Sequence, residues 1–149
     1  MDELLKILDN NLRYINHEIK ENRIIVYSES IQENSICPYC KTESKKVHSR
    51  YERKFQDLPI QGKKVTLLLQ RRKFFCLNEE CLHKTFAERF DFFDGPGRKT
   101  KRLQSEILRI SLNQSSISAS EYIKHSVADV GKSTICSLLK KRRSNYGNE

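Results

Sequence analysis

Four cysteines in two close pairs constrain the fold of this chain more than any other feature. Two residues separate Cys37 from Cys40, four separate Cys76 from Cys81, and 35 residues lie between the pairs. Such spacing is typical of closed zinc sites, in which four thiolates surround the ion tetrahedrally. We therefore predict a structural Zn2+ held by Cys37, Cys40, Cys76 and Cys81, with the intervening residues forming a hairpin that returns the chain to the metal.

Two alternatives to this ligand set stay open at the level of sequence. The cysteines could form a disulfide or be unrelated buried thiols, although disulfides are rare in the cytosol. His83, two residues after Cys81, could replace one cysteine as a ligand. Cys136 is expected in the core or half-buried. The remaining histidines are expected on strand or helix surfaces: His17, His48 and His125.

Composition explains why a metal is needed. With 37% hydrophobic and 32% charged residues, the 149-residue chain cannot bury a large apolar core, so a small β-rich domain needs a further source of stability. No apolar run approaches the roughly 18 residues that span a bilayer, and residues 1–10 lack the basic start and apolar stretch of a signal peptide. We expect a cytoplasmic, nucleoid-associated protein without a membrane partner.

The charge of the chain favours a polyanionic partner. The formal net charge is +9 and the pI is about 9.4. Residues 1–30 have a slight acidic excess, whereas residues 31–90 and 91–149 are both basic. A basic excess of this kind is the electrostatic footprint of many nucleic-acid-binding proteins. A basic protein with no nucleic-acid partner is the alternative.

The first part of the chain carries signals for a short helix and a hairpin. Residues 2–8 fit one or two helical turns, with three leucines on one side: Leu4, Leu5 and Leu8. Residues 12–19 and 23–30 are rich in strand-forming residues and flank Lys-Glu-Asn, a pattern that predicts a small hairpin.

Two longer strands are predicted between the two cysteine pairs. Residues 46–56 mix aromatic and charged side chains as an exposed strand does, and residues 65–75 follow after a turn marked by Pro59 and Gly62. Alternation at period two places three apolar side chains on one face of the second strand: Val65, Leu67 and Leu69.

The sequence becomes helical after residues 94–97, Asp-Gly-Pro-Gly, which interrupt any regular element. Leu103, Ile107 and Ile110 recur at i, i+4 and i+7 and predict a helix over residues 99–112.

Two further helix starts follow. A capping box with Ser118 as N-cap and Glu121 three residues later predicts the second helix, with Ile117 and Tyr122 as a hydrophobic staple. Gly131 is the expected N-cap of a third helix. Val130 and Ile135 are expected to form its hydrophobic staple. Ile135, Leu138 and Leu139 are expected to face inward. Three short helices with a tight turn before the last match a helix-turn-helix.

These elements predict an α+β protein in which a small β-rich zinc-ribbon-like domain precedes a three-helix helix-turn-helix. The expected boundaries are 1–34 for a short helix and β-hairpin lead-in, 35–92 for the zinc-binding domain, 93–98 for a linker, 99–143 for the helix-turn-helix and 144–149 for a flexible tail.

No enzymatic motif is complete. Residues 131–134, Gly-Lys-Ser-Thr, resemble the end of a phosphate-binding loop, but Ser126 stands where the first glycine is needed and no strand precedes it. Pro38 follows its cysteine, unlike the order in the zinc deaminase signature. A zinc ion with four cysteines has no open position for water. We expect no enzymatic activity.

A helix-turn-helix meets base edges through the N-terminal part of its last helix, while cations elsewhere contact phosphates. The candidate DNA-binding residues of the last helix are Lys132, Ser133, Thr134, Ser137, Lys140, Lys141 and Arg142. Candidates from the first helix and the β-rich part are Lys99, Arg102, Arg71 and Arg72. The alternative for each group is a solvated basic face.

The order of these motifs resembles the N-terminal part of insertion-sequence transposases of the ISL-three type. The strongest marks are His48-Ser49-Arg50-Tyr51, Asp57-Leu58-Pro59-Ile60, Arg71-Arg72 leading into Cys76, and Thr85-Phe86-Ala87-Glu88. The resemblance is specific over residues 37–90 and continues more loosely to about residue 143.

The resemblance implies a zinc-binding domain and a helix-turn-helix that together recognise the terminal repeats of a mobile element. In that family a long catalytic domain with an acidic triad follows, and the present sequence stops before it. We therefore expect a DNA-binding module without strand transfer: a truncated remnant, half of a frameshifted gene, or a short product that competes for the element ends.

Double-stranded DNA is the expected partner, with a full-length transposase or a second copy of the chain as further partners. The alternative function is a protein-interaction or regulatory module that docks a full-length transposase without touching DNA.

Overall fold

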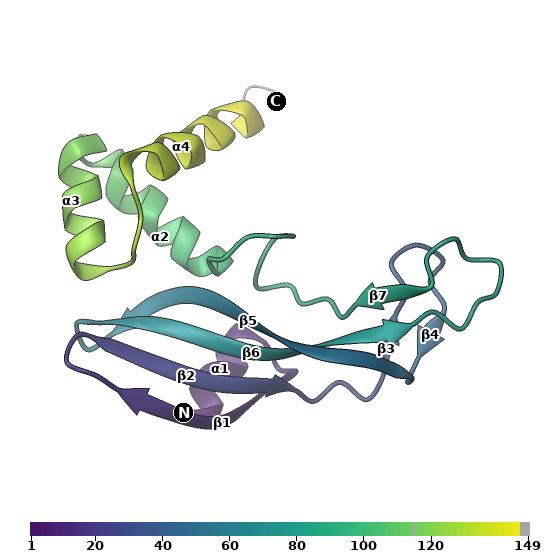
Figure 1. The fold of residues 1–149 in the computed structure, drawn as a ribbon. Coiled ribbons are helices and arrows are strands. Elements are labelled where there is room, and N and C mark those ends of the chain that lie inside the picture. The colour runs from purple at the N-terminus through teal and green to yellow at the C-terminus, as the bar shows by residue number, and fades with distance from the viewer. Residues whose placement is uncertain (115, 147–149) are drawn as a thin grey trace. The chain divides into compact units, whose positions relative to one another are not determined.

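The computed structural model describes residues 1–114 and 116–146 and shows a sheet-rich N-terminal part followed by three helices (Figure 1). The helices are α1, Asp2–Leu8; α2, Lys101–Leu112; α3, Ser116–Ser126; and α4, Lys132–Tyr146. The strands are β1, Leu12–Ile19; β2, Arg23–Ser30; β3, Ser35–Ile36; β4, Glu43–Ser44; β5, Val47–Ile60; β6, Lys63–Phe75; and β7, Thr85–Ala87. The predicted α+β class is confirmed. Within these residues no helix has both the length and the apolarity to cross a membrane.

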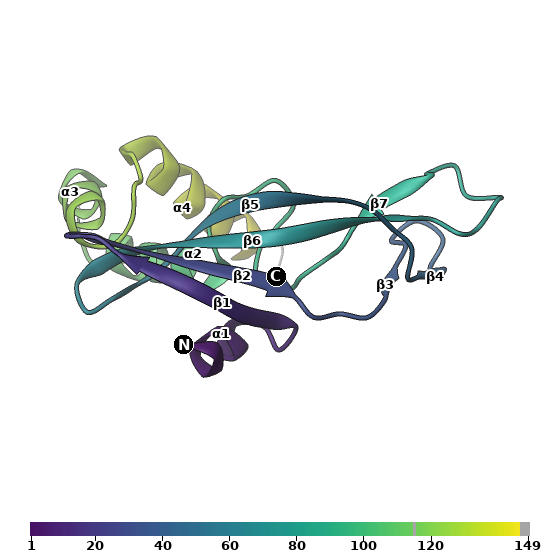
Figure 2. The ribbon, with the colours of Figure 1, turned by 60° about the horizontal axis from the view of Figure 1, so that its bottom comes forward.

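The strands form one large sheet and one small one. The large sheet has the order β1-β2-β6-β5, and β7 pairs antiparallel with the end of β6, where Phe74 lies opposite Phe86. β3 and β4 form a separate two-stranded sheet, in which Ser35 lies opposite Ser44. Figure 2 shows β5 and β6 running side by side as the two longest strands.

The chain divides into two compact units that interleave along the sequence. One unit consists of Met1–His17, Val26–Lys54 and Leu67–Phe92, and the other consists of Glu18–Ile25, Phe55–Thr66 and the chain from Phe93 onward. The four long strands therefore contribute residues to both units. The boundaries expected from sequence stay a prediction.

The N-terminal hairpin forms where the sequence predicts it, as β1 and β2. Helix α1 is tied to β1 because the Asp2 carboxylate accepts a hydrogen bond from the Tyr14 backbone N–H at 3.0 Å. Of the three leucines predicted on one side of α1, only Leu5 is buried, whereas Leu4 is half exposed. A helix of seven residues presents too short a face to bury all three.

The turn between β5 and β6 differs from the expectation in one respect. Gln61 and Gly62 form the turn with positive φ angles of 50° and 76°, as two-residue hairpins require. Pro59, predicted to mark the turn, lies inside β5 instead. β5 is the last strand in the sheet order, where a missing backbone donor is tolerated. The predicted inner face of β6 is confirmed, with Val65, Leu67 and Leu69 all buried.

The three helices share one apolar core. α2 begins two residues later than predicted, with Thr100 as N-cap, and its hydroxyl accepts from the Leu103 backbone N–H at 3.3 Å. The predicted inner face of α2 is confirmed. The buried members of this core are Leu103, Ile107, Ile110, Ala119, Ile123, Val127, Ala128, Val130 and Ile135, and Leu58 of β5 packs against them.

The predicted starts of the other two helices agree with the structure in one case and not in the other. The predicted capping box is wrong, because α3 begins at Ser116 and Ser118 lies inside it. The predicted staple is wrong as well, since Ile117 and Tyr122 are both more than half exposed. α4 begins directly after Gly131, whose carbonyl accepts from the Ile135 N–H at 3.3 Å, as predicted. α4 continues to Tyr146, and the last three residues of the expected tail lie outside the described residues.

Candidate metal centre and nucleic-acid surface

Two turns bring the four cysteines together. Cys37 and Cys40 lie between β3 and β4, whereas Cys76 directly follows β6 and Cys81 precedes β7. All four Sγ atoms lie within 4.8 Å of one another, and the sulfurs of Cys40 and Cys76 are 3.5 Å apart. Sulfurs bound tetrahedrally to zinc at about 2.3 Å lie about 3.8 Å apart. The four thiols are free of disulfides and fit a structural zinc ion.

Backbone hydrogen bonds close each of these turns. The Lys41 N–H donates to the Cys37 carbonyl and the Cys37 N–H donates to the Thr42 carbonyl, both at 2.9 Å. In the second turn the Cys76 N–H donates to the Lys84 carbonyl at 2.9 Å. Lys41 adopts a left-handed conformation with φ of 65°, which lets the chain reverse within the short Cys-x2-Cys loop. The cysteine positions are thus set by the backbone.

The protonation of the thiols makes cation binding pH-dependent. Hydrogen bonds from the hydroxyl and the backbone N–H of Thr42 lower the pKa of Cys40 to about 6. The Asn78 N–H favours the thiolate of Cys76, but burial and the Cys40 thiol outweigh it and raise the pKa of Cys76 to about 12. Zinc must displace protons from such thiols, so its affinity decreases as the pH falls.

Buried apolar side chains pack against the cysteines. Phe74 and Phe86 are buried beside them with ring centroids 5.9 Å apart. His83, the alternative ligand, is exposed, and its ring stacks on Tyr39 with centroids 3.5 Å apart. Because the four clustered sulfurs already supply the four ligands that a structural zinc takes, the site does not require His83.

Arg71 and Arg72, predicted to contact DNA, are both held by Glu88, a pairing that the sequence did not reveal. Glu88 is fully buried and forms an ion pair with Arg72 at 3.0 Å. The Ser30 hydroxyl donates to the same carboxylate at 2.7 Å. Arg71 donates to the Glu88 carbonyl at 2.8 Å and lies over the Tyr51 ring, and burial lowers its pKa. Both arginines therefore hold β6 to the segment after β7.

Arg102 is likewise paired within the chain. The buried Asp57 carboxylate accepts from the Thr100 hydroxyl and from Arg102 Nε, both at 2.8 Å. This hydrogen bonding raises the pKa of Arg102. Lys99 is half-buried and forms a backbone bridge with Gln56 of β5. The start of α2 is thus attached to β5, and these two cations are less available to phosphate than exposed ones.

The surface of α4 has the polarity expected from its periodicity. Ile135 is fully buried, and Leu138 and Leu139 pack against the same core. The exposed residues of this surface are Lys132, Ser133, Ser137, Lys140 and Lys141, and Thr134 and Arg142 are half-buried. The helix therefore presents hydroxyl and amine groups to solvent along its N-terminal and central turns.

The loop between α3 and α4 is attached to the hairpin ends of the sheet, which the sequence did not reveal. Asp129 forms ion pairs with Arg23 at 2.6 Å and Lys64 at 2.9 Å. The Gln56 side chain donates to the Asp129 carbonyl at 3.2 Å and accepts from its N–H at 2.6 Å. These contacts fix the loop that precedes α4.

Comparison with known families identifies the metal centre. Residues 33–81, which include all four cysteines, match the family described as the zinc-finger of transposase IS204/IS1001/IS1096/IS1165. A comparison with curated proteins gave no significant match, and neither did a comparison with solved structures. The suspected resemblance is confirmed over this segment, and the chain carries a transposase-type zinc finger.

Proposed function

We propose that this chain is a zinc-stabilised DNA-binding module that recognises the terminal repeats of a mobile element and has no strand-transfer activity of its own. In this proposal α3 and α4 form a helix-turn-helix, and α4 is the recognition helix. The transposase-type zinc finger and the net charge of +9 support a DNA partner. Such a module works at the nucleoid.

The observation that carries the proposal is the division of α4 into a buried and a polar face. Ser133 and Ser137 are exposed one turn apart near its start, where a recognition helix meets base edges. Lys140 and Lys141 follow on later turns, at positions suited to phosphates. Because carboxylates already hold Arg72 and Arg102, we treat the arginines of β6 and α2 as weaker candidates.

Fluorescence anisotropy of the full chain with a terminal-repeat duplex tests this function. We expect tighter binding to the repeat than to a scrambled duplex, and loss of the preference after treatment with a chelator. Each phosphate contact adds to the salt dependence of binding, so the affinity is also expected to fall steeply as the salt concentration rises. Equal, weak binding to both duplexes would show only generic attraction by charge.

A protein-docking function is the second candidate, and the exposed apolar side chains beside the cysteines favour it. Leu82 is 94% exposed, and Leu77 and Tyr39 are more than half exposed. Because the two compact units interleave, the full chain is the appropriate test material. A Leu82→Asp variant that loses capture of a full-length transposase, yet binds repeat DNA as the parent does, would assign this surface to protein docking.

A further inference from the structure

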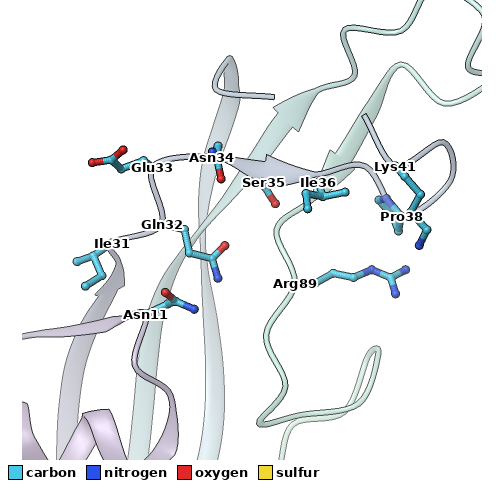
Figure 3. A pocket seen from close by; sticks show the side chains of 10 residues that line it. All are labelled: Asn11, Ile31, Gln32, Glu33, Asn34, Ser35, Ile36, Pro38, Lys41 and Arg89. Carbon is cyan, nitrogen blue, oxygen red and sulfur yellow. The ribbon is translucent and has the colours of Figure 1, made fainter. Parts of the chain in front are cut away.

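A pocket of about 560 Å3 opens between the β2–β3 connection and the segment after β7 (Figure 3). Its lining includes two cations, one carboxylate and three amide side chains: Lys41, Arg89, Glu33, Asn11, Gln32 and Asn34. In Figure 3 the Glu33 carboxylate lies on the side away from both cations. All of these lining residues belong to the unit that contains the metal centre. None of the residues that line the pocket belongs to α4.

The two cations of the pocket are available to an anion. Arg89 and Lys41 are both exposed, and neither side chain pairs with a carboxylate among the residues that the structure describes. In Figure 3 the Arg89 guanidinium and the Lys41 side chain lie toward the same end of the pocket. Their backbones are fixed, because Arg89 follows the buried Glu88 and the Lys41 N–H donates to the Cys37 carbonyl.

The amide groups lie on the other side of the pocket. Figure 3 shows the Asn11 and Gln32 side chains on the side of the pocket away from the cations. The Gln32 carbonyl accepts a hydrogen bond from Arg72, and the Asn11 carbonyl accepts from the Ile31 N–H at 2.8 Å, so both backbones are held. An amide offers a donor and an acceptor in one plane, which is the pattern that base edges present.

We propose that this pocket binds one nucleotide, either free or as an unpaired unit of a DNA strand. Arg89 and Lys41 would bind the phosphate, since guanidinium and ammonium groups match phosphate oxygens. Asn11 and Gln32 would face the base edge. The volume lies within the range of small-molecule pockets, of about 300–1,000 Å3, and the recess is too small for a duplex.

Anisotropy with the full, zinc-loaded chain and a fluorescein-labelled ten-nucleotide single strand tests the proposal. Arg89→Gln is compared with Arg98→Gln, which removes the same charge from an exposed arginine outside the pocket. Loss of a charge-assisted phosphate contact predicts about tenfold weaker strand binding for Arg89→Gln and less than a twofold change for Arg98→Gln. Equal losses in both variants would overturn the proposal.

Two further experiments distinguish a free nucleotide from an unpaired unit of a strand and test the role of the amide groups. Competition by AMP that depends on Arg89 would identify a free nucleotide as the ligand, whereas a strand that AMP does not displace would identify the unpaired unit. Gln32→Ala is expected to reduce the preference among strands of different base composition while zinc content stays at one equivalent. Failure of the repeat-duplex assay would count against the proposed function alone, because the comparison of Arg89→Gln with Arg98→Gln changes no residue of α4.

Discussion

The surroundings of two thiols predict opposite outcomes for the same substitution. Cys81 is buried and its sulfur lies within 4.8 Å of three others, whereas Cys136 is a half-buried residue of α4 outside this set. A serine hydroxyl is a poor zinc ligand, so Cys81→Ser is expected to lose most of the metal. Because binding of a structural zinc contributes folding free energy, the thermal midpoint should fall by about 10 °C or more.

Zinc content and circular dichroism melting check this prediction. Cys136→Ser is the matched control and should retain one zinc per chain and the parent's melting curve. A Cys81→Ser variant that keeps a full equivalent of zinc would contradict the four-cysteine site and would return His83 to consideration as a ligand.

The buried ion pair of Glu88 with Arg72 gives a second prediction, for the free energy of unfolding. Its side chain is fully buried, and Arg72 beside it is only 14% exposed. Glu88→Gln leaves the guanidinium buried without a countercharge, which costs about 3 kcal/mol of unfolding free energy. Glu106→Gln breaks an exposed pair with Arg109 and is expected to cost less than about 0.5 kcal/mol. Urea unfolding followed by circular dichroism measures both, and equal costs would show that burial of the first pair adds nothing.

Residue spacing revealed the metal site but not this ion pair. Zinc ligands recur at fixed short separations, so Cys37 and Cys40 could be assigned from sequence alone. Glu88 meets Arg72 across 16 residues and Ser30 across 58, through strand pairing that no local pattern encodes. The sequence shows the charge of Arg72 without its partner, and for this reason it was predicted to contact DNA.

Element starts show where local signals suffice. Gly131 predicts the start of α4 because glycine is accepted at an N-cap and the staple residues Val130 and Ile135 flank it. Ser118 does not predict the start of α3, since several serines precede it and each could cap a helix. Thr100 caps α2, and its hydroxyl is also held by Asp57, which lies 43 residues away on β5. Where several residues could cap a helix equally well, long-range contacts therefore determine at which one the helix begins.

The ion pairs of Asp129, in the loop before α4, predict a pH-dependent contribution to stability. Hydrogen bonds from Lys64 and Arg23 lower the pKa of Asp129 below its usual 3.8. A lowered pKa in the folded state stabilises the protein above the unfolded value and loses this effect only as the pH falls through the folded value. Asp129→Asn is expected to cost about 0.5 kcal/mol, because the carboxylate is 54% exposed.

The cost of Asp129→Asn should be constant between pH 8 and about pH 5, should decrease as the pH falls below 3.8 and through the folded-state pKa, and should shrink in high salt. Asp94→Asn is the control, since that carboxylate is 73% exposed and lies 3.5 Å from Lys101. Unfolding curves over this pH range measure both variants. A cost that changes between pH 8 and pH 5 would assign the effect to a group other than Asp129.

For the molecule as a whole, the sequence predicts a β-rich part that holds the cysteine site and is followed by helices, and the structure has this order. It places the division at residues 94–97, whereas the compact units cut across the strands. The reason lies in contacts made by the end of β5. Leu58 packs into the helical core, and the ring centroids of Phe55 and Phe93 are 4.5 Å apart. Apolar contacts between distant segments do not appear in a linear pattern.

The α4 surface gives the prediction that tests the molecule as a DNA reader. Lys140→Gln removes a phosphate-type contact, so it should weaken binding to the repeat and to a scrambled duplex by the same factor and should lower the salt slope by about 1. Ser133→Ala and Ser137→Ala remove groups placed at base edges. They are expected to weaken repeat binding by about tenfold at most while leaving scrambled DNA unaffected.

Anisotropy titrations at several salt concentrations measure all three variants with both duplexes. Lys20→Gln is a useful control, because it removes one exposed positive charge from the other end of the sequence. A recognition helix requires that the serine variants change the ratio of the two affinities and that Lys140→Gln does not. If all three variants weaken both duplexes equally, α4 attracts DNA by charge alone, and sequence reading must then be sought elsewhere on the molecule.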